Sequence, residues 1–270
     1  MRIFRELELG EATDSSVRDD EARARTNLAA VRAIVACGSA RGGVGKSALL
    51  VNIGAALALA GRKIGIVDAD LNSPSIAAML GIRVGRRAFV TDEIEPAAGP
   101  LGLRIVSSDF LPEGEPLVSF ADIDESTALA QNGASPCELG YLATMRCLLG
   151  RSRFGPLDLI LIDLASGIEH IYQIFKIMPR AKLLLVSHPS ELSARAMRAA
   201  IDITSQHADA VIGVVENMAG FNCDGCHRVR PLMPYGAVAA RAREAGAALL
   251  ERLPFDPRFA ETCDRGVIFM

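Results

Sequence analysis

The residues with the clearest chemical potential lie in Ser39–Ser47, whose sequence is SARGGVGKS. Its glycine N–H groups can line a polyphosphate, because glycine tolerates sharp bends and lets a ligand approach the backbone closely. Lys46 would reach the β- and γ-phosphates, and the Ser47 hydroxyl would complete the oxygen shell of a bridging Mg²⁺ ion. The segment therefore predicts binding of a nucleoside triphosphate, taken to be ATP, with magnesium. The expected binding residues are Gly42, Gly43, Val44, Gly45, Lys46, Ser47 and Ala48.

One position departs from the usual phosphate-loop spacing G-x-x-x-x-G-K-[ST]. Its first glycine is replaced by Ala40. If this position needs a positive φ, alanine would be strained by about 1 kcal/mol or more, and the start of the loop would be remodelled. The alternative is a glycine-rich turn before an ordinary helix. The order of strand, loop, Lys-Ser and helix favours the phosphate loop.

Three aspartates follow apolar runs that read as strands. Asp68 and Asp70 end the run at Ile64–Val67, and Asp163 ends a second run. Open α/β sheets place ligands at the carboxyl ends of their strands. Residues two apart face the same way, so the first two acids could approach Mg²⁺ or the attacking water, and Asp163 could hold the metal through water. The alternative for each is a helix cap or turn former.

Cys223 and Cys226 form a Cys-x-x-Cys pair in a polar loop, and the Asp224-Gly225 step between them favours a tight turn. A four-iron cluster or tetrahedral Zn²⁺ needs four ligands, so a symmetric homodimer that contributes one pair from each chain would complete the site. A redox-active dithiol and plain loop cysteines are alternatives. His227 also creates the haem c attachment pattern, which belongs outside the cytoplasm.

The remaining thiols and histidines suggest less. Four thiols read as small core residues: Cys37, Cys137, Cys147 and Cys263. His188 and His207 read as cap or surface residues, and we expect no functional role for His170.

Short apolar runs alternate with longer alanine-rich helical patterns, such as Ala48–Ala60 and the segment near Gly236–Ala247. Continuous rather than alternating apolarity indicates strands covered on both faces. The sequence therefore predicts an α/β fold, a P-loop NTPase with a mostly parallel sheet and helices on both faces. The expected strands are Ala33–Cys37, Ile64–Val67, Leu103–Val106, Leu157–Ile162, Leu183–Val186 and Val211–Val215.

The chain has 270 residues, enough for one large domain. We expect a charged, flexible arm at 1–30 and a single ATPase domain at 31–270, with an irregular excursion at 86–136 and the cysteine loop at 218–236. The net charge of -3 and the lack of a dense basic run argue against nucleic-acid binding. No apolar run is long enough to span a membrane. The sequence shows no N-terminal apolar segment preceded by basic residues of the kind that directs export, so we expect the six cysteines to be reduced thiols in the cytoplasm.

These pieces together resemble the deviant Walker A family of P-loop ATPases, which includes MinD, ParA, the nitrogenase iron protein and the Mrp/ApbC iron–sulfur cluster carriers. The resemblance is greatest to the Mrp/ApbC subgroup and covers most of the chain from about Ala33. It rests on Arg41–Ser47, on Val67–Ile76 with the following Met79–Gly81, on Val215–Met218 and on Cys223–Cys226.

The resemblance implies a nucleotide held between two subunits, with Arg41 in the place of a lysine that reaches the partner's phosphates. Arginine keeps the charge but has a differently shaped head. It also implies that Asp70 positions the attacking water, that Asn217 reads the adenine edge, and that Pro254 and Asp256 line the adenine pocket.

Several departures mark a divergent member of that family. The segment Asp163–His170 reads DLASGIEH, which is closer to the MinD pattern than to the Pro-Pro-Gly-Thr-Gly-Asp switch of Mrp-like chains. Ala48 replaces a common second hydroxyl, and 117–122 replaces a Trp-Arg-Gly-Pro element. We therefore expect slow or differently triggered hydrolysis.

The leading hypothesis is an ATP-dependent iron–sulfur cluster carrier or assembly scaffold that acts on apo iron–sulfur proteins, with a cluster, expected to be 4Fe–4S, bridged by Cys223 and Cys226 of two subunits. Two alternatives remain open. One is a MinD/ParA-like positioning switch without metal, although the chain lacks a basic amphipathic C-terminal helix. The other is a nucleotide-binding accessory protein dedicated to one metalloenzyme.

Overall fold

The computed structural model describes residues 22–71, 73–83, 93–110, 136–204, 207, 210–223, 225–226, 228–233 and 236–269. Their centre is an eight-stranded sheet with the order β10-β7-β6-β1-β5-β2-β4-β3. Every neighbouring pair is parallel except β3 and β4. The strands are β1 (Ala33–Gly38), β2 (Ile64–Ala69), β3 (Ala97–Ala98), β4 (Arg104–Ser107), β5 (Leu159–Leu164), β6 (Lys182–Ser187), β7 (Val211–Glu216) and β10 (Leu249–Arg252).

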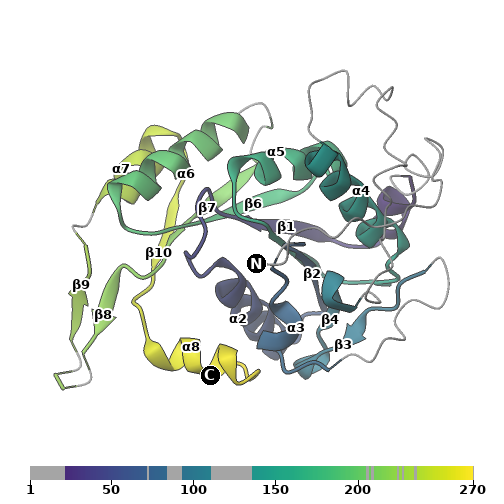
Figure 1. Ribbon diagram of the computed structural model, residues 1–270, viewed down its shortest axis with the longest axis horizontal. Helices are drawn as coiled ribbons and strands as arrows, with labels where there is room; N and C mark the ends of the chain where they lie inside the picture. The colour runs from purple at the N-terminus through teal and green to yellow at the C-terminus, as the bar shows by residue number, and fades with distance from the viewer. Residues whose placement is uncertain are drawn as a thin grey trace.

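Helices cover both faces of the sheet (Figure 1). One layer holds α2 (Lys46–Leu59), α3 (Ile76–Met79) and α8 (Pro257–Asp264). The other holds α4 (Pro136–Arg151), α5 (Ile168–Ile177), α6 (Glu191–Thr204) and α7 (Ala237–Glu244). Short 3-10 turns η1 (Pro100–Gly102) and η2 (Ser108–Phe110) flank β4. The predicted fold class is confirmed.

The two layers enclose separate apolar cores, and the strands divide their side chains between them. In β5, Ile160 and Ile162 enter the core under α4, α5 and α6, whereas Leu161 enters the core under α2. Successive strand residues point to opposite faces, so a strand buried on both sides must be apolar throughout. This explains the continuous apolar runs in the sequence.

The strand boundaries differ from expectation in a few places. β5 begins at Leu159 rather than Leu157, because the Leu157 carbonyl accepts a hydrogen bond from the Arg32 N–H ahead of the ladder. The short strands β3 and β10 were not predicted, since two to four mostly exposed residues give no periodic signal. Ala24 and Leu28, inside the expected arm, are fully buried, so packing begins before Val31. Most of the expected excursion at 86–136 lies outside the described residues.

Beyond the sheet, β8 (Gly220–Asn222) and β9 (Val229–Pro231) form an antiparallel hairpin that projects away from the body of the protein (Figure 1). The sequence predicted only a loop here. The hairpin is attached by the Phe255 N–H, which donates to the Gly220 carbonyl at 2.6 Å. Helix α7 follows β9 and returns the chain to the sheet.

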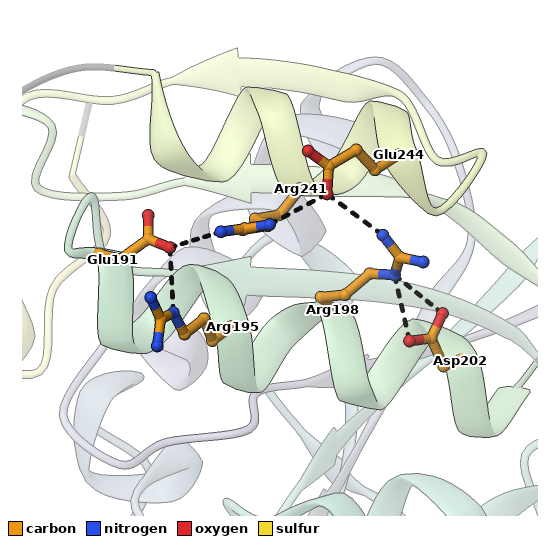
Figure 2. Close-up of polar contacts among 6 residues, drawn as sticks. All are labelled: Glu191, Arg195, Arg198, Asp202, Arg241 and Glu244. Atoms are coloured by element: carbon orange, nitrogen blue, oxygen red, sulfur yellow. Dashed lines mark hydrogen bonds and ion pairs between the residues drawn. The ribbon is translucent and has the colours of Figure 1, made fainter.

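An ion-pair network fastens α7 to α6, as Figure 2 shows. Arg241 of α7 contacts Glu191 at 2.8 Å and Glu244 at 3.2 Å. Arg198 of α6 contacts the same Glu244 at 3.3 Å. The charges alternate in sign, so each guanidinium lies between carboxylates on an otherwise exposed helix pair.

In the part of the chain that the structure describes, no helix has the length and apolarity needed to cross a bilayer.

Candidate functional site

Five parallel strands end at one edge of the sheet and bring the polar side chains together. Asp68 of β2 and Cys37 of β1 are both register partners of Asp163 in β5. Ser187 of β6 is paired in the same way with Glu216 of β7. The expected acids therefore share the carboxyl edge with the phosphate loop, which follows β1 directly. In open α/β sheets, this edge is where ligands bind.

The backbone of the phosphate loop adopts a left-handed conformation at two of its glycines. Gly43 and Gly45 have φ values of 76° and 78°, in the left-handed region. A Cβ on Gly45 would lie 2.5 Å from the side-chain nitrogen of Asn217, so this position needs glycine for conformation and for space. Among the described residues, positive φ outside glycine occurs only at Leu101 and Met218, so Ala40 carries none of the strain considered above.

Lys46 and Asp163 form a buried ion pair at the base of the loop. The Lys46 ammonium lies 2.5 Å from one Asp163 oxygen, and the two side chains are 5% and 0% exposed. The ammonium also contacts the Ser47 hydroxyl at 3.3 Å. Burial raises the pKa of Asp163, and the Lys46 charge opposes this rise. Such a pair is costly to separate, because either charge alone would be buried without compensation.

The donor set beside this pair fits a magnesium ion. The second carboxylate oxygen of Asp163 is buried and has no hydrogen-bond partner among the described residues. The Ser47 hydroxyl lies near enough to affect the pKa of the same carboxyl. A carboxylate oxygen and a hydroxyl are hard ligands of the kind Mg²⁺ takes, with water and phosphate oxygens completing the shell.

Asp68 and Asp70 have different surroundings. Asp68 is fully buried, and one of its oxygens accepts hydrogen bonds from the N–H groups of Ser75 at 2.9 Å and Ile76 at 3.0 Å. It therefore holds the start of α3, which is the capping role that the sequence left open. Burial raises its pKa to about 7. Asp70 is only half-buried and accepts a hydrogen bond from the Ser73 N–H at 3.2 Å, which leaves it freer to act on a ligand.

Sequence reasoning missed the contacts that join the phosphate loop to the segment after β5. The Ser39 and Ser166 hydroxyls lie 3.3 Å apart, and the Gly167 N–H donates to the Ser39 carbonyl at 2.9 Å. The sequence shows that Ser39 and Ser166 each follow a strand, but only the fold shows that their hydroxyls lie close together. These two contacts join the phosphate loop to the segment that follows β5.

The residues assigned by resemblance lie around the same edge. Asn217 donates from its side-chain nitrogen to the Val44 carbonyl at 2.8 Å and so ties the loop to β7. Asp256 caps α8 through the Arg258 N–H at 2.9 Å, and the Arg258 guanidinium lowers its pKa. Arg41 is exposed and makes no ion pair among the described residues. Pro254 lies between β10 and α8.

The cysteine pair occupies the tip of the β8–β9 hairpin. The Cys223 N–H donates to the Arg228 carbonyl at 3.2 Å, which closes the turn. Cys223 is half-buried and Cys226 is exposed. The Cys223 sulfur is 3.9 Å from where a Cβ on Gly225 would lie, so it turns toward the glycine. Asp224 and His227 are outside the described residues.

Among the residues that the structure describes, no three histidine, cysteine or acidic side chains gather in a metal-binding group.

Cys37, Cys147 and Cys263 are buried, as predicted, whereas the burial of Cys137 is not described. His188 is half-buried, with a ring nitrogen 3.0 Å from the Met218 sulfur.

The chain matches the ParA family model, described as NUBPL iron-transfer P-loop NTPase, over residues 30–132 and 136–270. The chain belongs to this family. The chain is similar to an iron-sulfur cluster carrier protein of Saccharolobus solfataricus, with 34% identity over 86% of this chain and 74% of the relative. The human cytosolic Fe-S cluster assembly factor NUBP2 is 31% identical over 90% of this chain and 87% of its own.

A solved structure supports the same assignment. A nucleotide-binding protein of Archaeoglobus fulgidus in complex with ADP superposes with a TM-score of 0.73 at 28% identity and covers 91% of each chain. The cell division ATPase MinD of Pyrococcus furiosus, at 20% identity and a TM-score of 0.56, covers 88% of this chain and 89% of its own and shares the fold. The resemblance drawn from the sequence is confirmed at the level of the family.

Proposed function

We propose that this NUBPL-family protein is an ATP-dependent iron–sulfur cluster carrier or assembly scaffold that hands its cluster to apo-proteins. The observation that carries the proposal is the combination, in one chain, of the buried Lys46–Asp163 pair under a phosphate loop and a Cys-x-x-Cys turn at the tip of a projecting hairpin. Family membership supports both halves, and relatives are named for cluster carriage and assembly.

In this proposal, binding of Mg·ATP exchanges the partners of the buried pair. The phosphates draw the Lys46 ammonium away from Asp163 and replace one anionic partner with another. The Asp163 carboxylate and the Ser47 hydroxyl would hold Mg²⁺, and the bound ion would supply Lewis-acid stabilisation of the phosphates. The half-buried Asp70 orients the water that attacks the γ-phosphate. Contacts of Gly42–Ser47, Asn217, Pro254 and Asp256 with the nucleotide belong to this proposal.

The cluster is the cargo and requires a second copy of the chain. Cys223 and Cys226 supply two thiolates, and a 4Fe–4S cluster takes four. A two-fold axis through the hairpin tips supplies the second pair. The exposed Arg41 is free to reach the nucleotide of the partner subunit, which links dimer closure to ATP. A homodimer that works among soluble apo-proteins, in the cytoplasm, completes the proposal.

Anaerobic reconstitution with iron and sulfide, with and without Mg·ATP, tests the proposal. Iron per chain, oligomeric state and phosphate release are measured on the same samples. Cys223→Ser should lose the iron and its visible absorption but keep phosphate release. Cys263→Ala, which alters a buried thiol in α8, is the matched control and should keep both.

A fully loaded monomer, or a Cys223→Ser protein that keeps the chromophore, would contradict the shared cluster. Turnover without iron would identify a metal-free positioning switch. Iron without turnover would identify an accessory protein dedicated to one metalloenzyme.

A further inference from the structure

A strained backbone at the nucleotide edge belongs to a residue with no role so far. Met218 has a φ of 55°, in the left-handed region that residues other than glycine rarely adopt. This conformation is unfavourable for a residue with a Cβ, and it persists where the surrounding contacts hold it. Among the described residues the other such case is Leu101, which lies in η1 at the amino end of β4. Strained backbone of this kind is concentrated at functional sites.

Met218 lies against the phosphate loop. A Cβ on Gly45 would be 3.4 Å from the methyl carbon Cε of Met218, so this methyl group covers the glycine that precedes Lys46. The neighbouring Asn217 donates from its side chain to the Val44 carbonyl at 2.8 Å, which fixes the residue before the bend to the same loop. Two successive residues after β7 therefore lie against two successive residues of the phosphate loop.

The end of β6 also contacts this bend. A ring nitrogen of His188, directly after β6, lies 3.0 Å from the Met218 sulfur. The Asn217 N–H donates to the Ser187 carbonyl at 2.9 Å, so the backbone just before the bend is fixed to β6 as well. The sulfur and the methyl group of Met218 thus contact different elements. These contacts hold the side chain in place and, with it, the left-handed backbone.

The bend leads directly into the cysteine hairpin. The Ala219 N–H donates to the Leu253 carbonyl at 2.8 Å, and the Phe255 N–H donates to the Gly220 carbonyl at 2.6 Å. Strand β8 begins at this glycine, and Cys223 follows the strand without a gap. The chain from the phosphate-loop contacts to the first sulfur is therefore one short, hydrogen-bonded segment, and the bend sets its direction.

We propose that Met218 is a positioning residue that couples the nucleotide site to the cysteine pair: its side chain fixes the left-handed bend against the phosphate loop, and the bend orients the hairpin that carries Cys223 and Cys226. The assignment rests on the proposed function. Met218 takes no part in phosphate chemistry and supplies no ligand to the cluster. A nucleotide in the phosphate loop then changes the reactivity of the thiols, and linkage requires that the state of the thiols changes nucleotide affinity by the same factor.

Met218→Ala tests the coupling, because it removes the side chain from between the two elements. The readout is the rate at which iodoacetamide alkylates Cys226, an exposed thiol, in reduced, metal-free protein, followed by peptide mass spectrometry. In the wild type, saturating Mg²⁺ with a non-hydrolysable ATP analogue should change this rate about fivefold. In Met218→Ala the change should fall below about twofold, with the affinity for the analogue within about twofold of the wild type. Light scattering on the same samples ensures that proteins in the same oligomeric state are compared.

Two further variants complete the design. Met233→Ala is the matched control, since this exposed methionine follows β9 and is outside the bend, and it should keep the wild-type effect of the nucleotide. His188→Ala removes the partner of the Met218 sulfur on β6 and should also weaken that effect. It carries the test if Met218→Ala does not fold.

Thermal melting tests the bend without nucleotide. Met218→Gly and Met218→Ala both lack the side chain, but only the alanine variant keeps the unfavourable left-handed backbone. Met218→Gly should therefore melt about 1–2 °C above Met218→Ala, whereas glycine at an ordinary position is less stable than alanine. A lower melting temperature for the glycine variant would overturn the strained bend.

Three results would overturn the assignment alone: a wild type that binds the analogue without a change at Cys226, a Met218→Ala protein that keeps the wild-type change, or a parallel loss of nucleotide affinity in that variant, which would place the residue in the binding site itself. A wild-type protein that does not bind the analogue would instead overturn the proposed function, and the assignment with it.

Discussion

At the carboxyl edge of the sheet, Lys46 and Asp163 lie almost entirely out of water, and the loop above them is tied to strands on both sides. At the hairpin tip, Cys226 is exposed, and the two strands of the hairpin are only three residues long each. The first region is built to hold charge in a fixed geometry, which phosphate chemistry needs. The second gives its sulfurs access to another protein. A carrier needs both properties, and this fold keeps them on separate elements.

The largest effect should come from Lys46→Ala. The change leaves the Asp163 carboxylate buried without its partner, so the free energy of unfolding should fall by about 3 kcal/mol or more in urea titrations at neutral pH. The loss should shrink at lower pH, because the raised pKa of Asp163 lets it take up a proton. Cys226→Ser, at the hairpin tip, should change stability by less than about 0.5 kcal/mol. Equal losses in the two variants would remove the contrast between the regions.

A pair of glycine variants isolates the packing of the phosphate loop. Gly43→Ala meets only the conformational cost of a positive φ, about 1 kcal/mol, because no atom lies within 4 Å of the new Cβ. Gly45→Ala has the same cost and also displaces Asn217 from the Val44 carbonyl, so we expect about 1–2 kcal/mol more. Urea unfolding measures both. Indistinguishable variants would show that the Asn217 contact contributes nothing to the loop.

The pH dependence of the nucleotide-free protein tests the burial of Asp68. Burial raises the pKa of Asp68 from its ordinary value of 3.8 to about 7, so between these two pH values the folded state holds a proton that the unfolded state has lost. The free energy of unfolding should therefore fall as pH rises from about 4 to about 7, with no further contribution from this group above that window. Asp68→Asn should flatten the slope in metal-free buffer. A variant as steep as the wild type would refute the assignment.

The smallest effect concerns the region around the hairpin. Arg241→Ala breaks two contacts of the network that fastens α7 to α6 (Figure 2). Because these groups are exposed, we expect a Tm decrease of about 1–2 °C at low salt that disappears at high salt. Arg243→Ala, on the same helix, has no ion pair among the described residues and is the control. A salt-independent loss would point to packing rather than charge.

Local patterns in the sequence were enough to predict the phosphate loop, the parallel sheet and the aspartates that follow its strands. Each of these depends on residues close together in the chain, such as Gly45 next to Lys46. What could not be predicted depends on contacts between distant segments. Asp68 holds the start of α3 because the chain returns and brings the N–H groups of Ser75 and Ile76 to its carboxylate.

The hairpin shows the same limit at short range. Cys223 and Cys226 were recognised by their spacing, but each of the strands around them is only three residues long, which is too short to show a periodicity. The condition under which Ala40 would be strained, a positive φ, is not met for a related reason. The spacing rule identifies which positions are usually glycine, but only the backbone shows that Gly43 and Gly45 are the left-handed ones.

The separation of partners along the chain has a consequence for how the protein is made. Lys46 pairs with Asp163, which lies 117 residues later in the chain, and the Val44 carbonyl accepts a hydrogen bond from the Asn217 side chain, 173 residues later. During translation, the phosphate-loop segment is thus synthesised long before its partners, and a fragment that ends before Asp163 lacks both contacts. The sulfurs emerge within a few residues of that final amide. The last contact of the phosphate loop and the cysteine pair therefore become available nearly together, and a product that ends before Asn217 lacks both.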